Sequence, residues 1–167
     1  PANSPQGTAG ATVGAGGATI VNPEAYNAMA WLRIEADNTV RIMVAKSEMG
    51  QGVLTSLPMI IADELDADWS RVKTAHAPLG RAFDDPRANA RDTGGSRSVR
   101  LSYDLMRSIG ASAREMLVSA AAAQWGVDAA QCTARDSFVA HPPSGRRLAY
   151  AAVASAAAKL EVPAKPK

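Results

Sequence analysis

The sequence predicts an α+β fold in which a small mixed β-sheet carries long helices packed on one face. Two short segments, 29–35 and 39–44, alternate apolar and polar residues on either side of a turn, as the strands of a hairpin do. Two longer segments, 53–65 and 96–125, repeat apolar residues every three or four positions, which is the period of a helix that faces a core. A third alternating segment, 70–76, separates the two helical patterns.

Composition and charge limit the function classes open to this chain. Hydrophobic residues make up 47% of the 167 positions, but alanine supplies much of that share and aromatic residues only 5%, which suits close helix packing. The formal net charge is +2, and the basic residues are scattered rather than grouped with aromatics, so a nucleic-acid partner is not expected. No apolar run approaches the ~18 residues that a membrane-spanning helix needs.

Cysteine and histidine usage argues against a structural metal site within the chain. Cys132 is the only cysteine, which excludes an internal disulfide and a CxxC metal motif. The two histidines, His76 and His141, lie far apart in the sequence, and neither has a partner at helical spacing. We expect Cys132 to be a small buried residue rather than a reactive thiol.

Both ends of the chain are expected to lie outside the folded unit. Residues 1–27 form a tail rich in Gly and Ala, and Thr12–Gly17 within it does not qualify as a dinucleotide fingerprint because no strand precedes it. The start at Pro1 fits a mature terminus left by removal of an export signal, and equally a boundary set by cloning. Residues 162–167 have the composition of a linker.

The first half of the core is predicted as a hairpin followed by a helix and a strand. The turn of the hairpin is Ala36–Asn38. Acidic residues gather at the end of helix 53–65, and they lack the glycine and the spacing of a calcium loop, so we expect a solvated face. An irregular polar loop, 77–91, follows strand 70–76. The core-facing residues expected on helix 53–65 are Leu54, Leu57, Ile61 and Leu65.

The second half begins with the long helix 96–125. Ser96 or Ser98 is expected to cap its start, and Gly126 is a natural stop. A short helical turn at 128–131, a hairpin of strands 132–140 and 146–148, and an alanine-rich helix at 149–160 complete the expected elements. The face expected to point into the core comprises Val99, Ser102, Met106, Ile109, Ala113, Met116, Leu117 and Ala120.

Two glycine-rich turns carry the strongest functional signal. The first, Ser47–Gly52, lies where strand 39–45 gives way to a helix, and the second, Asp92–Ser98, opens the next long helix. Glycines at helix N-termini let backbone N–H groups approach a bulky ligand, and the helix dipole favours a negatively charged one. Taken singly, each turn is equally explained as a plain turn or an ordinary helix start.

Together with segments 66–72 and 144–150, the two turns resemble the molybdenum-cofactor domain of the xanthine dehydrogenase and aldehyde oxidoreductase family. The resemblance runs from about 27 to 163, and it is strongest to the large subunits of isoquinoline 1-oxidoreductase and of bacterial membrane-associated aldehyde dehydrogenases. It implies that residues 28–161 are part of a larger molybdopterin-binding domain, and that 162–167 leads to the remainder of the large subunit.

The resemblance also implies roles for individual residues. Gln51 would donate a hydrogen bond to the apical oxo ligand of molybdenum, with Gly50 and Gly52 as positions of close approach. Arg97 would pair with a phosphate or lock its own loop, and both readings stay open. Glu48 is expected to be structural rather than a catalytic acid. The residues expected to bind the pterin and its dinucleotide are Thr93, Gly94, Gly95, Ser96, Arg97 and Ser98.

The implied reaction is oxidation of an aldehyde to a carboxylic acid with water as the oxygen source, at molybdopterin in its cytosine dinucleotide form. Hydroxylation of an aromatic N-heterocycle by the same chemistry and a non-catalytic interaction domain are the alternatives. Expected partners are the remainder of the large subunit, a [2Fe-2S] small subunit and a cytochrome c subunit carrying haem c. The family's Gly-x-Gly-Glu base motif does not occur in these 167 residues, so activity of the chain alone is not expected. Twin-arginine export signals of relatives imply a periplasmic location, membrane-associated through a partner subunit.

Overall fold

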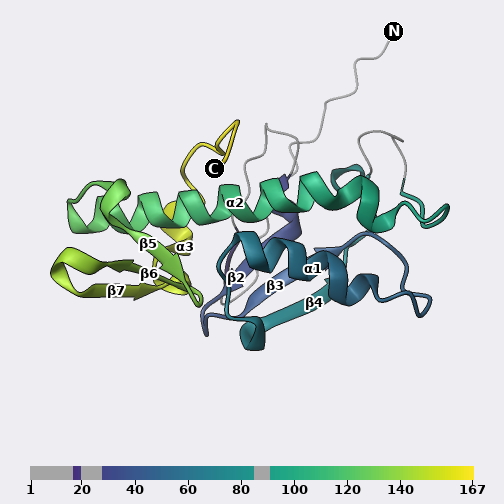
Figure 1. The fold of residues 1–167 in the computed structure, drawn as a ribbon, viewed down its shortest axis with the longest axis horizontal. Helices are drawn as coiled ribbons and strands as arrows, with labels where there is room; N and C mark the ends of the chain where they lie inside the picture. The colour runs from purple at the N-terminus through teal and green to yellow at the C-terminus, as the bar shows by residue number, and fades with distance from the viewer. Residues whose placement is uncertain (1–16, 20–27, 85–90) are drawn as a thin grey trace, which may run out of the picture.

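A computed structural model of the chain describes residues 17–19, 28–84 and 91–167. In these ranges the protein has two β-sheets, and the longest helix extends past both of them (Figure 1). The class is therefore α+β, as the sequence predicts. No helix of the described ranges is long and apolar enough to cross a membrane.

The first sheet has four strands in the order β1-β2-β3-β4. Strands β1 (Gly17–Thr19), β2 (Leu32–Glu35) and β3 (Val40–Val44) pair antiparallel, whereas β4 (Val72–His76) pairs parallel to β3. The parallel pair requires a crossover, which helix α1 (Val53–Glu64) supplies. The sheet is thus mixed because one hairpin is followed by a β-α-β unit.

Alternate residues of the central strands form the core beneath α1. In β2 and β3 every second side chain is buried, and α1 packs against β3 and β4. Of the residues expected on the inner face of α1, Leu54 is only half-buried, and the other three are buried. The buried apolar residues of this part are Leu32, Ile34, Val40, Ile42, Val44, Val53, Leu57, Ile61 and Leu65.

Helix α2 (Ser98–Trp125) packs closely on α1, and Gly110 is the point of nearest approach. A Cβ added to Gly110 would lie 2.5 Å from the carbonyl oxygen of Ile61 and 2.7 Å from Cβ of Glu64. The glycine is therefore required by packing rather than by backbone conformation. Of the α2 residues expected in the core, Val99 is wrong because it is 39% exposed, and the other seven are buried.

The second sheet is a three-stranded antiparallel meander of β5 (Thr133–Arg135), β6 (Phe138–His141) and β7 (Arg146–Ala149). The sequence predicted one continuous strand over 132–140. Instead, Asp136 and Ser137 both take positive φ, of 51° and 62°, and form a tight two-residue turn between β5 and β6. Helix α3 (Tyr150–Ala157) follows β7 and packs against α2.

Ser137 links the second sheet to the first half of the chain. Its backbone N–H donates to the carbonyl of Asp66 at 2.9 Å, and its Oγ accepts from the N–H of Asp68, also at 2.9 Å. Its carbonyl accepts from Nδ2 of Asn38 at 3.1 Å and from the N–H of Tyr150 at 3.1 Å. A single buried serine therefore joins the hairpin turn of the first sheet, the end of α1 and the start of α3.

Two further bonds extend this buried network. Asn38 Oδ1 accepts from the N–H of Ala151 at 2.9 Å, and Asn38 has the positive φ, 69°, that a hairpin turn requires. The hydroxyl of Tyr150 donates to the carbonyl of Leu65 at 2.6 Å, and burial raises the pKa of that hydroxyl. The tyrosine stays neutral and satisfies a carbonyl at the end of α1.

The short 3₁₀ turns refine the expected boundaries. They are Ala28–Trp31, Trp69–Arg71, Arg81–Phe83, Ala129–Gln131 and Pro142–Ser144. Strand β1 lies inside the segment 1–27 that the sequence assigns to a tail, and it pairs with β2. The rest of that segment, including the rejected fingerprint at 12–16, lies outside the described residues, as does 85–90 of the polar loop.

We predict that Gly110→Ala destabilises the fold by about 1–3 kcal/mol, because the added methyl meets backbone atoms of α1 that cannot move independently. A glycine inside an unobstructed helix would instead gain up to about 1 kcal/mol on the same change. Chemical denaturation of the purified variant measures the difference. Ser119→Ala, on the exposed side of α2, is the control. Increased stability of Gly110→Ala would contradict the close approach.

Candidate functional site

The first glycine turn is organised by Glu48. Its carboxylate accepts from the backbone N–H groups of Gly50 at 2.8 Å, Gly52 at 3.0 Å and Leu54 at 3.0 Å. Gly50 and Gly52 have φ of 93° and 81°, a conformation that disfavours side chains. These bonds, that to Leu54 first, lower the pKa of Glu48. Glu48 therefore caps α1 as an ionised group, which confirms its expected structural role.

Gln51 closes the other side of the same turn. Its Nε2 donates to the carbonyl of Ser47 at 2.7 Å, and its Oε1 accepts from the N–H of Met49 at 2.6 Å. A side-chain amide has two N–H hydrogens, and the bond to Ser47 uses one of them. The loop thus holds the exposed amide in place and leaves one hydrogen for another acceptor.

The second glycine turn is closed by an ion pair. Arg97 pairs with the carboxylate of Asp92, and its Nε donates to the carbonyl of Gly94 at 3.3 Å. Gly95 and Ser96 both take positive φ, of 61° and 53°. Of the two roles that the sequence left open for Arg97, locking its own loop is therefore the one with contacts in the structure.

Helix α2 begins without the cap that the sequence predicted. The N-cap residue is Arg97, which makes no side-chain capping bond, so neither Ser96 nor Ser98 is the N-cap residue. The first intrahelical bond of this end runs from the N–H of Leu101 to the carbonyl of Arg97, at 2.9 Å. The start of α2 thus presents backbone donors and the positive end of the helix dipole, whereas the start of α1 is occupied by Glu48.

The structure brings the two turns together at one end of the molecule (Figure 1). The backbone N–H of Ser47 donates to Oγ1 of Thr93 at 2.9 Å. The ammonium of Lys46 donates to the carbonyl of Asp92 at 3.0 Å and lies 3.9 Å from its carboxylate. Segments 46 residues apart in sequence therefore form one continuous surface, which contains every site residue that the sequence proposed.

The backbone of both turns is open to a ligand. A Cβ built on Gly50, Gly52 or Gly94 would have no heavy atom within 4 Å, whereas one built on Gly95 would lie 3.2 Å from Nε of Arg97. Open space beside a glycine backbone is what close approach of a large cofactor needs. Donors at the start of α2 suit its phosphates, and the Gln51 amide suits a neutral or oxo acceptor. The residues present therefore fit a pterin cofactor.

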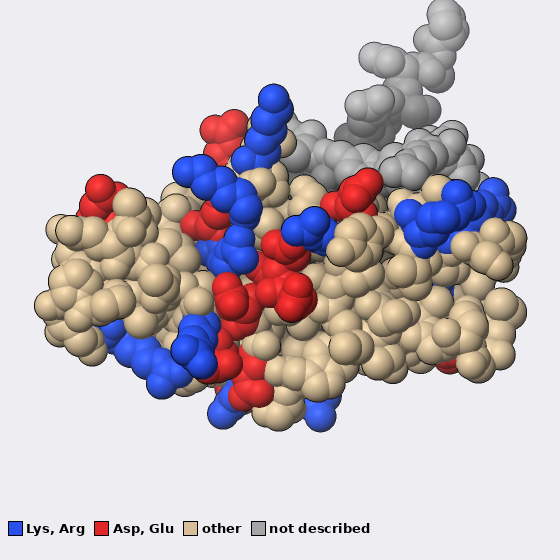
Figure 2. Space-filling model, in the orientation of Figure 1, with Lys and Arg blue, Asp and Glu red and all other residues tan. Residues whose placement is uncertain are grey.

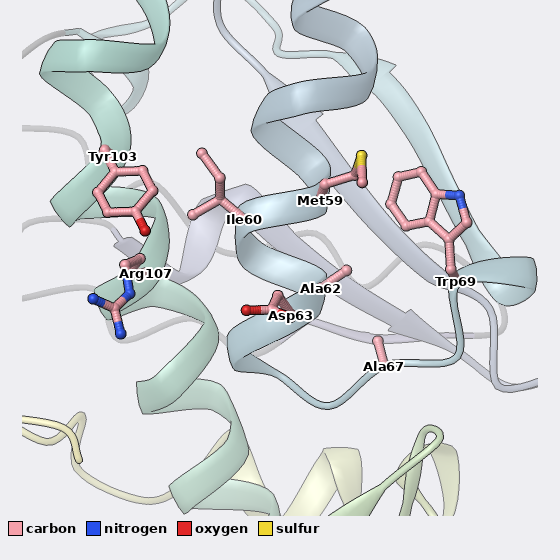
Figure 3. Close-up of a pocket in the computed structure, with 8 residues that line it drawn as sticks. All are labelled: Met59, Ile60, Ala62, Asp63, Ala67, Trp69, Tyr103 and Arg107. Atoms are coloured by element: carbon pink, nitrogen blue, oxygen red, sulfur yellow. The ribbon is translucent and has the colours of Figure 1, made fainter.

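The hollow shown in Figure 3 is separate from these turns. It has a volume of about 390 Å³ and lies beside the middle of α1, where Met59, Trp69 and Tyr103 are partly exposed. Its lining residues include none from 47–52 or 92–98. The backbone N–H groups of a helix interior are already bonded, and the one basic side chain among its lining residues, Arg107, is paired with Glu64. The two glycine turns therefore stay the predicted place for a cofactor.

Acidic residues at the end of α1 form ion pairs with arginines of α2. Glu64 pairs with Arg107 and lies 4.0 Å from Arg114, which is 3.6 Å from Asp66. Figure 2 shows acidic and basic side chains interleaved in a band across the middle of this face rather than a continuous basic surface. The acidic cluster expected as a solvated face is thus partly ion-paired to α2.

Paired glycine turns at two helix starts are typical of domains that bind a large cofactor through backbone donors. The chain belongs to the molybdopterin cofactor-binding domain family, whose model matches residues 3–166. This family is the one that the resemblance of the two turns predicted.

Individual relatives are similar over most of this chain but are much longer. The beta subunit of isoquinoline 1-oxidoreductase from Brevundimonas diminuta is 38% identical over 122 residues, which cover 72% of this chain and 16% of that protein. The membrane-bound aldehyde dehydrogenase [pyrroloquinoline-quinone] of Gluconacetobacter polyoxogenes is 32% identical over 126 residues, which cover 75% of this chain and 15% of that protein. The chain therefore spans about a sixth of the length of these relatives.

A solved structure supports the fold. The crystal structure of quinoline 2-oxidoreductase from Pseudomonas putida 86 superposes with a TM-score of 0.55 and 18% sequence identity. The match covers 75% of this chain and 15% of that one. The α+β arrangement thus corresponds to one part of a larger oxidoreductase.

Sequence reasoning missed Lys46. The signal available was a lone basic residue directly after the apolar run of β3 and directly before the first turn. A charged residue at that place is expected to need a partner, but the partner lies on the second turn, which sequence alone does not bring near.

We predict that Glu48→Gln lowers the stability of the fold at neutral pH, because a neutral amide accepts less strongly from three N–H groups. The pKa of Glu48 is lower in the folded than in the unfolded chain, so its contribution is present above the unfolded pKa of about 4.3 and is lost as the pH falls through the folded pKa. Denaturation midpoints of wild type and variant should therefore converge as the pH falls below the unfolded pKa of Glu48. A pH-independent difference, or one shared by the exposed control Glu161→Gln, would contradict the capping role.

Proposed function

We propose that this chain is the molybdopterin-binding portion of a molybdenum hydroxylase that oxidises an aldehyde to a carboxylic acid with oxygen from water. The observation that carries the proposal is the joining of the two glycine turns through the bond from Ser47 to Thr93. One turn offers a held amide at Gln51, and the other offers open backbone and an uncapped helix start. A cofactor with a metal at one end and phosphates at the other needs a side-chain donor at the first end and backbone donors at the second.

The chain's own residues would bind and orient the cofactor. The bound group would supply the oxidising centre that accepts two electrons from the substrate. The free amide hydrogen of Gln51 would donate to the metal-bearing end of the cofactor, and the bond from Nε2 to the carbonyl of Ser47 keeps that hydrogen oriented. The N–H groups at the start of α2 would receive phosphate oxygens of the cytosine dinucleotide form.

A proton acceptor for the reaction is expected from other polypeptide. The carboxylate of Glu48 is bonded to three backbone N–H groups and has a lowered pKa, which makes it a poor base. Residues 28–161 would thus form the cofactor-binding portion, followed by a linker at 162–167, with the base in the remainder of the large subunit. Electrons would leave through a [2Fe-2S] small subunit and a cytochrome c subunit carrying haem c, in the periplasm at the membrane.

Hydroxylation of an aromatic N-heterocycle is the second candidate. It is favoured by the names of two similar proteins, an isoquinoline 1-oxidoreductase subunit and a quinoline 2-oxidoreductase. The name of the aldehyde dehydrogenase relative also includes pyrroloquinoline quinone. Metal and cofactor analysis of the purified assembly distinguishes a molybdenum hydroxylase of either kind from a non-catalytic interaction domain. Stoichiometric molybdenum with a pterin supports the proposal, and a quinone without molybdenum contradicts it.

We predict that Gly94→Val abolishes retention of the cofactor while the fold is kept. A Cβ at Gly94 has no heavy atom within 4 Å and requires no positive φ, so a side chain there would extend into the space proposed for the ligand. Gly95 is less informative, because its φ of 61° and the nearby Arg97 would strain any substitution. Molybdenum and pterin contents of the purified assembly are the measurement. Ala123→Val, on an exposed part of α2, is the control, and normal loading of Gly94→Val would exclude contact between this turn and the cofactor.

We predict that Gln51→Ala lowers turnover by about 100- to 1,000-fold, because loss of one oriented donor at a reacting centre raises the barrier by about 2.7–4 kcal/mol. Gln51→Glu keeps an acceptor for the N–H of Met49 and removes both N–H donors, including the one bonded to the carbonyl of Ser47, so it should lower turnover as well. Steady-state turnover per bound molybdenum is the measurement, with the exposed Gln131→Ala as control. Wild-type turnover of a fully loaded Gln51→Ala variant would exclude the role.

A further inference from the structure

We propose that Lys46 is a positioning residue that holds the second glycine turn, 92–98, in place against the first. The proposal rests on the proposed function for its consequence, which is retention of the cofactor. Its physical basis, the coupling of two turns by one buried ammonium, is independent of that function.

The burial of Lys46 is unusual for a lysine. Its side chain is 8% exposed, and it is the only buried lysine or arginine in the part of the chain that the structure describes. An ammonium removed from water is costly unless hydrogen bonds and an opposite charge replace the water. Lys46 therefore has to be satisfied by its surroundings.

The ammonium of Lys46 makes two contacts with Asp92. Nζ donates to the carbonyl oxygen of Asp92 at 3.0 Å, and the Asp92 carboxylate is 3.9 Å away. Asp92 in turn pairs with Arg97, which also donates to the carbonyl of Gly94. The ion pair of Asp92 and Arg97 closes the second turn on itself, and Lys46 anchors the closed turn to the end of β3.

Lys46 extends from a well-packed part of the fold. Lys46 follows β3, whose alternate residues are fully buried, and Val44 accepts from the N–H of Ala77 at 2.9 Å. The neighbouring residue Ser47 donates to Thr93 and begins the first turn. Consecutive residues thus contact consecutive residues of the second turn, so the separation of the two turns is set by Lys46 and Ser47.

The charge of Lys46 matters in addition to its length. Lys46 and Arg97 bring two positive charges to the single negative charge of Asp92, which gives this cluster at the start of α2 an excess of one positive charge. The nearby negative charge of Glu48 is bonded to backbone N–H groups at the start of α1. A ligand bearing phosphate groups gains from that excess, and the gain is lost when Lys46 is made neutral. Lys46 thereby acts on the ligand through Asp92 and the turn, not by direct contact.

The test compares Lys46→Met, Lys46→Gln and Lys46→Arg in the purified assembly. Hydrogen exchange of the peptide that covers 92–97 reports the position of the turn, and molybdenum and pterin contents report retention of the cofactor. For Lys46→Met we expect roughly tenfold faster exchange in this peptide, the lower limit for loss of a hydrogen bond to a charged group, and a several-fold loss of cofactor. Lys46→Arg should restore both, and the exposed Lys73→Met should change neither.

The outcomes are distinguishable. Unchanged exchange at 92–97 in Lys46→Met, or equal loss of cofactor in Lys46→Arg and Lys46→Met, would overturn the role of Lys46. If Lys46→Met does not fold, Lys46→Gln, which keeps a neutral donor, is compared with Lys46→Arg, and equal exchange in the two overturns the proposal. Wild-type protein without molybdenum would overturn the proposed function instead, and the exchange measurement would still decide whether Lys46 holds the turn.

Discussion

The close approach of α1 and α2 over Gly110 is the constraint on which the arrangement of this domain depends. Only a hydrogen fits between the α2 backbone and the carbonyl of Ile61, and alanines at positions such as 113, 120 and 121 keep the rest of the buried face small. Small residues let two helices approach until their backbones nearly touch, and the gain is a dense contact with few aromatic residues. Because α1 and α2 each begin at a glycine turn, the helix contact carries both turns on one packed pair of helices, and the bonds of Lys46 and Ser47 then join the turns to each other.

Local sequence patterns predicted the helices and the hairpin, which form through contacts between residues close together in the sequence. Helical periodicity identified α1 and α2, and alternation around Asp37 identified the β2–β3 hairpin. The turn between β5 and β6 was missed because Asp136 and Ser137 take positive φ without a glycine, which depends on the bonds that Ser137 makes to distant parts of the chain. Strand β1 was missed for a similar reason, since three residues in a Gly-rich segment become a strand only by pairing with β2.

The sequence identified the residues of the two glycine turns, but not the hydrogen bonds that these residues make. Glycines and polar residues identified both turns, but nothing in the sequence distinguishes a glutamine that reaches outward from one that also closes its own loop, as Gln51 does. The helix starts differ in a way that the sequence did not predict, because Glu48 lies four residues before one N-cap and the expected serines do not cap the other. The chain also spans only 15–16% of the length of its two relatives.

The length of α2 has a mechanical consequence. Its 28 residues form a continuous rod of about 42 Å, with the second glycine turn at one end and the second sheet packed near the other. Gly110 lies close to the midpoint of this helix, so α2 contacts α1 near its centre. A change in the angle between α1 and α2 would move the two ends of α2 in opposite directions. A displacement of the helix near β5 and β6 would therefore also displace the backbone at the start of α2.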